Sequence, residues 1–220
     1  KRQDSDGDGT GDYIQGNSGS AVTITNNTVM ITAADFSLVG TIDSGSGDIT
    51  LSNSTATGSI GLGAADEDFD VADAELDQIT TSGTLTVGGA NTTSIVVDGV
   101  TDPANIATFV LDATRNGASV TTENGASTFN VLTANADDGI TVNADLATDN
   151  GDLVLDGDAD GAADSADRVA VGGGVTISAV GNLSVDATTN GVRLNGANGT
   201  THTFTSVSYT HLRAHETLLD

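Results

Sequence analysis

The sequence predicts an all-β protein whose short strands follow one another as a stack of similar repeats. One glycine-led phrase recurs along the 220 residues, and within each copy apolar and polar residues alternate with the period of a strand. Aromatic residues make up only 3% of the chain, and Trp is absent. Because a compact sandwich draws on large aromatic side chains for its core, this composition favours rows of Val, Ile, Leu and Ala covered by neighbouring repeats.

The recurring phrase is densest between Gly139 and Gly196, where no segment fits a long amphipathic helix. A glycine opens each copy, and aliphatic residues then alternate with Thr, Ser, Asn or Asp. The apolar face of these strands is expected to consist of Ile140 and Val142, Leu153 and Leu155, Val175 and Ile177, Leu183 and Val185, and Val192 and Leu194.

Earlier copies of the phrase extend the pattern toward the N-terminus. Gly47-Asp-Ile-Thr-Leu51 matches Gly151-Asp-Leu-Val-Leu155, and Gly83-Thr-Leu-Thr-Val87 matches Gly181-Asn-Leu-Ser-Val185. Strand starts recur about every 10 to 13 residues, which suits short strands joined by tight turns. An antiparallel sandwich has similar spacing, so spacing alone leaves both architectures open.

The charge of the chain restricts its partners. The formal net charge is −25, which disfavours nucleic acid and anionic membrane surfaces because both would be repelled. Carboxylates favour hard cations such as Ca²⁺, although an acidic surface also serves solubility alone. There is no Cys, so disulfides and thiolate metal sites are excluded, and no apolar run is long enough to insert into a membrane.

Two aspartate-rich stretches have the spacing of a calcium loop, in which alternate carboxylates converge and a glycine at the sixth place allows a sharp turn. The first resembles the repeats of thrombospondin type 3, has Gln15 at the twelfth place, and offers Asp4, Asp6, Asp8 and Asp12 as ligands. A flexible acidic linker is the alternative. The second has Gly161 at the sixth place and offers Asp156, Asp158, Asp160, Asp164 and Asp167. A plain solvent-exposed insertion between strands is the alternative there.

No catalytic residues are expected. The acidic stretch from Asp66 to Asp77 lacks calcium-loop spacing and is interpreted as a solvated strand face followed by a helical turn from Ala74 to Gln78. His202 is the only histidine outside the C-terminal tail, so no nucleophile–His pair can be assembled. Away from the ends, the only basic residues are Arg115, Arg168 and Arg193.

The C-terminal tail differs from the rest of the chain. Residues 207 to 217 resemble the translation of an adapter used in transposase-based sequencing libraries, which indicates a gene fragment from bulk sequencing. The helical metal-pair spacing of His211 and His215 is therefore rejected as a site. The predicted organisation is an acidic calcium-loop-like linker over 1–19, a repeat region over 20–206 and a non-native tail over 207–220.

Three phrases resemble repeats of filamentous-haemagglutinin-like bacterial surface proteins: residues 74–88, 140–146 and 181–188. The resemblance implies a right-handed parallel β-helix, incomplete at both ends. It also implies a non-catalytic shaft segment of a secreted or cell-surface adhesin, located outside the cell or on the bacterial surface. Its partners would be neighbouring repeats and a host-cell, matrix or glycan ligand. The alternatives are a calcium-dependent antiparallel β-sandwich adhesin module and a polysaccharide-degrading β-helix enzyme.

Overall fold

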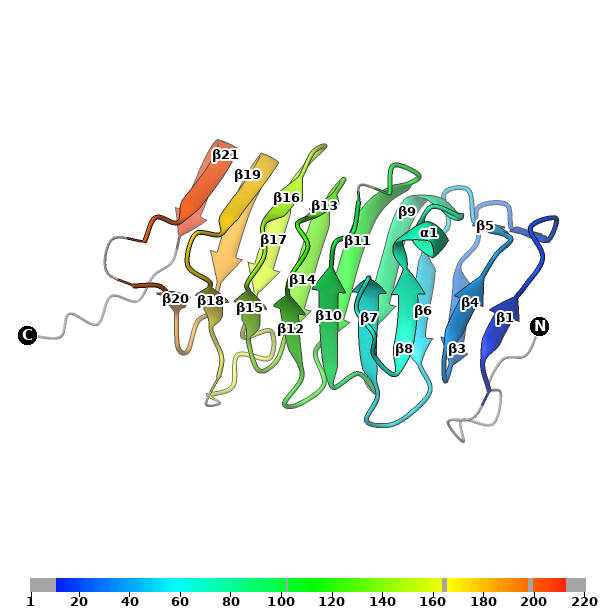
Figure 1. Ribbon diagram of the computed structural model, residues 1–220, viewed down its shortest axis with the longest axis horizontal. Helices are drawn as coiled ribbons and strands as arrows, with labels where there is room; N and C mark the ends of the chain where they lie inside the picture. Colours follow the sequence, from blue (N-terminus) through cyan, green and yellow to red (C-terminus); the bar gives the residue numbers. More distant parts are fainter. Residues whose placement is uncertain (1–10, 102, 164–165, 198–199, 213–220) are drawn as a thin grey trace, which may run out of the picture.

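A computed structural model describes residues 11–101, 103–163, 166–197 and 200–212, with the backbone alone for 207–212. The chain is all-β, and its strands form an elongated stack with β1 and β21 at opposite ends (Figure 1). Every pairing between the described strands is parallel. The many-stranded parallel sheets are those of a β-helix or solenoid-like fold, and they exclude the antiparallel sandwich.

One side of the stack consists of short strands in nearly sequential order. A two-stranded sheet joins β1 to β4, and β8 lies next to β4 and begins a seven-stranded sheet. In spatial order the strands are β1 (Tyr13–Gln15), β4 (Phe36–Leu38), β8 (Phe69–Ala72), β7 (Ser59–Gly63), β10 (Ser94–Asp98), β12 (Ser119–Thr122), β15 (Ile140–Val142), β18 (Val169–Val171) and β20 (Val192–Leu194).

The other strands line the remaining sides of the stack. Some of them are long strands that bend at a corner and so belong to two sides. β19 pairs with β16 through Ile177 and with β17 through Leu183, so a single strand serves two sides. The short strands are β2 (Ala21–Thr23), β5 (Thr41–Asp43), β13 (Ser127–Phe129), β16 (Leu146–Thr148), β3 (Val29–Ala33), β6 (Ile49–Asn53), β14 (Leu132–Ala136) and β17 (Leu153–Asp156). The long strands are β9 (Ile79–Gly88), β11 (Ile106–Ala113), β19 (Thr176–Asp186) and β21 (Thr203–Leu212).

The core is a set of apolar columns that run along the axis. In-register pairing stacks like on like from coil to coil, and one such column contains Ile49, Leu85, Phe109, Leu132, Leu153 and Leu183. The few aromatic rings stack on one another as well. Phe109 and Phe129 meet edge to face with centroids 4.9 Å apart, which adds a directional contact to the buried area.

The predicted apolar faces are buried, with exceptions at the C-terminal end. Leu194 is 53% exposed and Val192 is partly exposed, because β20 is the last strand of its sheet and no described strand covers it. The prediction that Gly181 opens a separate strand is wrong. Gly181 lies inside β19, which continues through the corner beside the exposed Val180.

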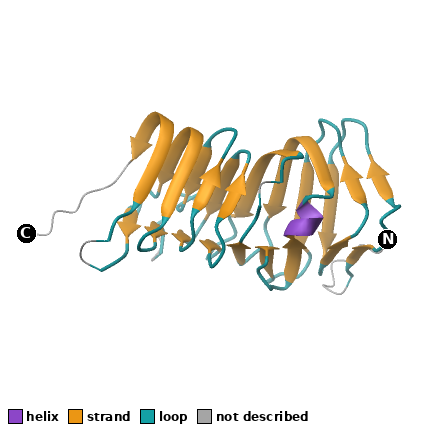
Figure 2. Ribbon diagram, turned by 45° about the horizontal axis from the view of Figure 1, so that its top comes forward, coloured by secondary structure: helices purple, strands orange, loops and turns teal. Residues whose placement is uncertain are grey.

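The length of a coil varies along the stack. Thr32 and Ser52, hydrogen-bonded across neighbouring coils, are 20 residues apart, whereas Asp48 and Thr84 are 36 apart. The longer coil contains β7, β8 and the short helix α1 (Asp73–Leu76), which is the one helix drawn among the described residues (Figure 2). Within it β8 follows β7 in sequence but lies on the N-terminal side of it in the sheet, so the strand order is locally reversed.

Parallel pairing extends beyond the predicted repeat region at both ends. β1 lies within the range assigned to the linker and pairs with β4, with Tyr13 beside Phe36. The backbone of β21 continues to Leu212, inside the range assigned to the tail, and pairs with β19.

Candidate functional site

The repeated Gly-Asp phrase forms a hydrogen-bonded connection between coils, called here the aspartate latch. The Oδ1 atom of Asp48 accepts a hydrogen bond from the backbone N–H of Thr84 at 2.9 Å, and that of Asp152 accepts one from Asn182 at 2.7 Å. Thr84 and Asn182 each follow the glycine of the next copy of the phrase. A Cβ on Gly181 would lie 2.3 Å from Asp152 Oδ1, so glycine is required for the close approach.

Other carboxylates bind the backbone of a neighbouring coil in the same way. Asp98 Oδ1 accepts from Gly125 N at 2.8 Å, Asp145 Oδ1 from Thr176 N at 2.7 Å, and Asp73 Oδ1 from Thr101 N at 2.8 Å. Hydrogen bonds to a charged acceptor are stronger than neutral ones. Many of the acids therefore have a structural role, so the negative charge alone does not indicate a reactive site.

The predicted acidic patch is built around α1. Phe69, Val71 and Leu76 are buried, and the helix begins at Asp73, one residue before the predicted helical turn. The carboxylate of Glu75 accepts from Leu38 N at 2.7 Å and from Ala72 N at 2.9 Å. Burial raises the pKa of Glu75, and these two hydrogen bonds partly offset the increase.

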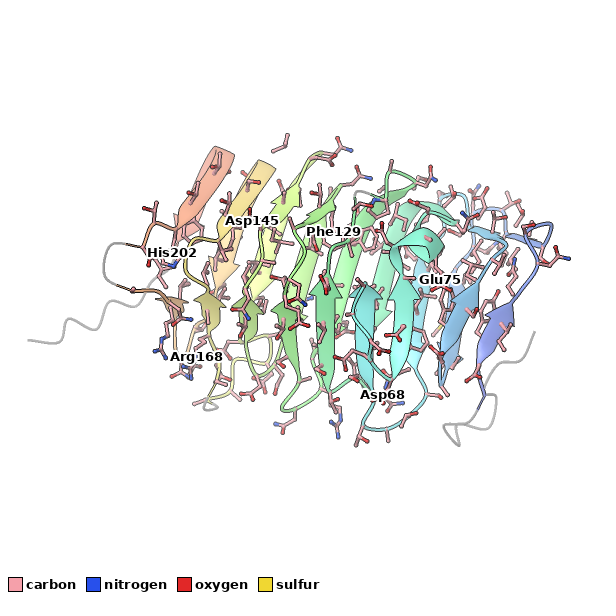
Figure 3. The ribbon with its side chains drawn as sticks, viewed as in Figure 1. Asp68, Glu75, Phe129, Asp145, Arg168 and His202 are labelled. Atoms are coloured by element: carbon pink, nitrogen blue, oxygen red, sulfur yellow. The ribbon has the colours of Figure 1, made fainter. Side chains whose placement is uncertain are left out.

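Hydrogen bonding and burial shift the pKa values of two other carboxylates of the patch in opposite directions. Hydrogen bonds from the backbone and side chain of Ser59 lower the pKa of the exposed Asp68 (Figure 3), whereas burial raises the pKa of Asp70. Asp68 and Ser59 join β7 to the segment before β8. The patch thus secures the reversed strand order.

The first predicted calcium loop lies mostly outside the described residues, because Asp4, Asp6 and Asp8 fall there. Asp12 is exposed. Gln15 is buried and is bound on both sides of its amide: Nε2 donates to Ser20 O at 3.0 Å, and Oε1 accepts from the Tyr13 hydroxyl at 2.7 Å. Nε2 also donates to Thr41 O in the next coil at 3.2 Å, so the twelfth position of this loop joins the first two coils.

The second predicted calcium loop leaves the stack at the end of β17. Asp156 is half-buried, Asp158 is buried, and Gly161 has a positive φ of 66°, as the turn requires. Asp160 is exposed, and its Oδ1 accepts from Ala162 N within the same loop at 2.8 Å. Asp167 is buried on the far side of the loop, and Asp164 lies outside the described residues.

The carboxylates of this loop that the structure describes are not brought into a common ligand set. Asp158 Oδ2 accepts from the backbone N–H and the hydroxyl of Thr189 in the next coil, at 2.8 and 2.7 Å. Within the described ranges no group of three or more His, Asp or Glu side chains has an arrangement that holds a metal ion. Calcium binding by this loop stays a prediction.

Sequence reasoning missed Asp186. It is the in-register neighbour of Asp156 across β17 and β19. Burial raises the pKa of Asp156, and the charges of Asp186 and Asp158 raise it further. Alignment of the phrases that begin at Gly151 and Gly181 would have found the pair, because both end on Asp at the same position.

A shallow groove of about 540 Å³ runs along one corner of the stack. Its lining is uncharged, combines polar with small apolar residues, and consists of Asn26, Gly45, Ser46, Thr80, Thr81, Ser82, Ala104, Asn105, Ala107, Asn130 and Asn150. Acid–base cleavage of a glycosidic bond requires a pair of carboxyl groups, and none lines this groove. His202 lies at the far end of the stack (Figure 3), where its Nε2 is 2.7 Å from the carbonyl oxygen of Asn195.

No protein-family model, curated protein or solved structure matches the chain. The fold therefore defines the class of protein, an all-β chain with parallel solenoid-like sheets, and no family is assigned. No helix in the described part of the chain is long and apolar enough to cross a membrane.

Proposed function

We propose that the chain is a structural shaft segment of a large secreted or cell-surface bacterial adhesin or exoprotein, without catalytic activity. The observation that carries the proposal is the continuous parallel stack, in which apolar columns join each coil to the next and aspartate latches add hydrogen bonds at two of the junctions. A stack of this kind can be extended by further coils without a change in design. Its length then serves to hold a distant part of the protein away from the cell.

The handedness and the neighbours of the stack form part of the proposal. We assign a right-handed coil, because crossover connections between parallel strands are almost always right-handed and the resembling family has that hand. The partly exposed Val192, Leu194 and Phe204 supply an apolar end onto which a neighbouring repeat would pack.

Calcium is proposed to stiffen one or both aspartate-rich loops, with ligands drawn from Asp4, Asp6, Asp8 and Asp12 in the first. The second would draw on the residues from Asp156 to Asp167. The acidic surface makes a host-cell or matrix protein with a basic patch, or a neutral glycan, the most compatible ligand. Nucleic acid is disfavoured as a partner.

Mechanical stretching of the chain between its two ends tests the shaft role. A stack with nearest-neighbour contacts is expected to unravel in successive steps, each releasing one coil. Each step would lengthen the chain by about 3.3–3.6 Å for every residue released. A single cooperative rupture with no coil-sized steps would contradict the proposal, as would release of new reducing ends from a polysaccharide panel.

The proposed location is tested separately. Antibodies raised against the chain are expected to label intact bacterial cells that carry the full gene, or to detect the protein in their medium. Labelling that required permeabilised cells would contradict an extracellular location.

A further inference from the structure

Uncharged side chains line the shallow groove at one corner of the stack, although the chain as a whole carries a net charge of −25. The groove has a volume of about 540 Å³, which lies within the range of ligand sites in proteins. Gly45, Ala104 and Ala107 carry no side chain long enough to fill it. The corner is therefore a candidate binding site whose chemistry contrasts with the acidic composition of the chain.

The groove extends along the axis of the stack and crosses several coils. Hydrogen bonds at successive junctions between coils join Asn26 to Ser46, Gly45 to Ser82, Thr81 to Asn105, Ile106 to Asn130, and Asn130 to Asn150. At about 4.8 Å for each coil, these junctions together span about 24 Å. A ligand that follows the groove is therefore linear and contacts several coils at once.

Two of the asparagine side chains in the groove are fixed by the fold. Asn26 has a positive φ of 56°, and its Oδ1 accepts a hydrogen bond from Ser46 N at 3.1 Å. Asn130 Nδ2 donates to Ile106 O at 2.8 Å. Within the described ranges the second polar atom of each amide has no partner, so it is available to a ligand. A ligand bound by fixed side chains loses less entropy than one that must order them.

The other two asparagine side chains in the groove are not held by the fold. Asn105 and Asn150 are exposed, and neither side chain is hydrogen-bonded to another described residue. Their backbones join neighbouring coils, because Asn105 O accepts from Thr81 N at 2.9 Å and Asn150 N donates to Asn130 O at 3.2 Å. Replacement of these two side chains is therefore expected to leave the fold unchanged.

The lining favours a neutral ligand rich in hydroxyl groups. Amide and hydroxyl side chains both donate and accept hydrogen bonds, as the hydroxyl groups of a sugar do. Among the described residues no charged side chain lines the groove to pair with an ionic ligand, and the exposed Asp149 next to Asn150 repels anions. The described lining also has no aromatic or large aliphatic side chain, so a peptide with apolar anchors gains little there.

We propose that this groove binds a linear neutral oligosaccharide along the axis of the stack, through the side-chain amides of Asn26, Asn105, Asn130 and Asn150. The inference rests on the proposed adhesin role and deepens it, because it assigns one of the compatible ligands to a place on the chain. The stretching experiment uses no ligand, so the shaft role and the groove can fail separately.

The experiment is a calorimetric titration of the full chain with neutral hexasaccharides of glucose, mannose and N-acetylglucosamine, and with the acidic hexasaccharide of galacturonic acid. The wild type is expected to bind at least one neutral probe, and to bind the acidic probe at least about tenfold more weakly. Asn105→Ala and Asn150→Ala each remove hydrogen bonds to the sugar, so each is expected to weaken binding about three- to tenfold. The double variant is expected to weaken it about ten- to hundredfold, because the two side chains lie two coils apart and act independently.

The matched control is Asn143→Ala. Asn143 is exposed, follows β15 at a different corner of the stack, and has a side chain with no hydrogen-bond partner in the described part of the chain. This variant is expected to bind the neutral probe as the wild type does.

The melting temperature separates a ligand-binding role of these side chains from a structural one. Asn105→Ala and Asn150→Ala are expected to melt at the wild-type temperature, whereas Asn130→Ala, which removes the hydrogen bond to Ile106 O, is expected to melt at a lower one. A lower melting temperature in Asn105→Ala and Asn150→Ala would assign their side chains to the fold and overturn the proposal. Failure of every neutral probe to bind, equal binding of the acidic probe, or full binding by the double variant would also overturn it.

Discussion

Gly181→Ala tests the reason for the repeated glycine. Gly181 lies in β19 opposite the Gly151-Asp152 turn of the preceding coil. A Cβ there would lie 2.3 Å from Asp152 Oδ1, 2.7 Å from the carbonyl carbon of Gly151 and 2.8 Å from Asp152 N. Two of these three atoms belong to the backbone, so rotation of a side chain cannot relieve the whole clash.

The expected loss of stability follows from the steric contacts at Gly181 and from the hydrogen bond of Asp152. Overpacking at a fixed backbone typically costs about 1–3 kcal/mol, and the two backbone contacts place Gly181→Ala near 2–3 kcal/mol. Asp152→Ala removes the 2.7 Å hydrogen bond from Asn182 N, at an exposed site, so we expect about 1 kcal/mol. In the double variant the contact between the new Cβ and Asp152 Oδ1 disappears. The loss of stability in the double variant should therefore be about 0.5–1 kcal/mol smaller than the sum of the losses in the two single variants.

Urea unfolding of the four proteins measures these free energies of unfolding. Gly16→Ala is the matched control, because its nearest atom, Ile14 Cγ2, would lie 3.8 Å from the new Cβ. We expect a change of less than about 0.5 kcal/mol there. The account of the latch would be refuted if Gly181→Ala were no more destabilising than Gly16→Ala, or if the double variant were strictly additive.

Two further predictions concern charge and packing. Because burial raises the pKa of Glu75, Asp70 and Asp156, the folded state binds protons more tightly than the unfolded state. Their contribution to stability is complete below the unfolded-state pKa values and is lost as pH rises through the folded ones. The calcium-free melting temperature is therefore expected to rise as pH falls from 7 to about 5. Asp68 acts in the opposite direction but is exposed, and a steady decrease in melting temperature over that interval would contradict the assignment. Phe109→Ala, at a side chain with no exposed area, is expected to cost about 3–5 kcal/mol in urea unfolding, and a cost below about 1 kcal/mol would contradict the stacked core.

The strands and their apolar faces could be predicted from sequence because a period of two marks one face of a strand. Leu153 and Leu155 belong to two neighbouring columns, in which the in-register residues of β14 and β19 are also apolar. The parallel direction of the strands was expected only from the family resemblance, because the spacing of the strands suited an antiparallel sandwich equally well. The corner inside β19 was not predictable, because Gly181 has the same local sequence whether it opens a strand or turns within one.

The side-chain sites were less predictable because they depend on which coils are neighbours. Asp152 and Asn182 are 30 residues apart, and only the coil length brings them together. The reversed order of β7 and β8 depends on hydrogen bonds such as that between Ser59 and Asp68, which leave no periodic pattern. The spacing of the loop after Asp156 identified carboxylates but could not identify Asp186 as their neighbour.

The most direct test of the stacked parallel coils is a pair of distances between spin labels. Met30, Thr50, Thr86, Val110, Thr133, Val154 and Ser184 form one outward row, and the chain has no native Cys to interfere with labelling. At about 4.8 Å for each coil, labels at Met30→Cys and Val110→Cys should lie about 14 Å apart, and labels at Met30→Cys and Ser184→Cys about 29 Å apart. Two distances in this near 1:2 ratio are the predicted result. A distance between labels at Met30 and Ser184 that is no greater than the distance between labels at Met30 and Val110 would contradict the fold.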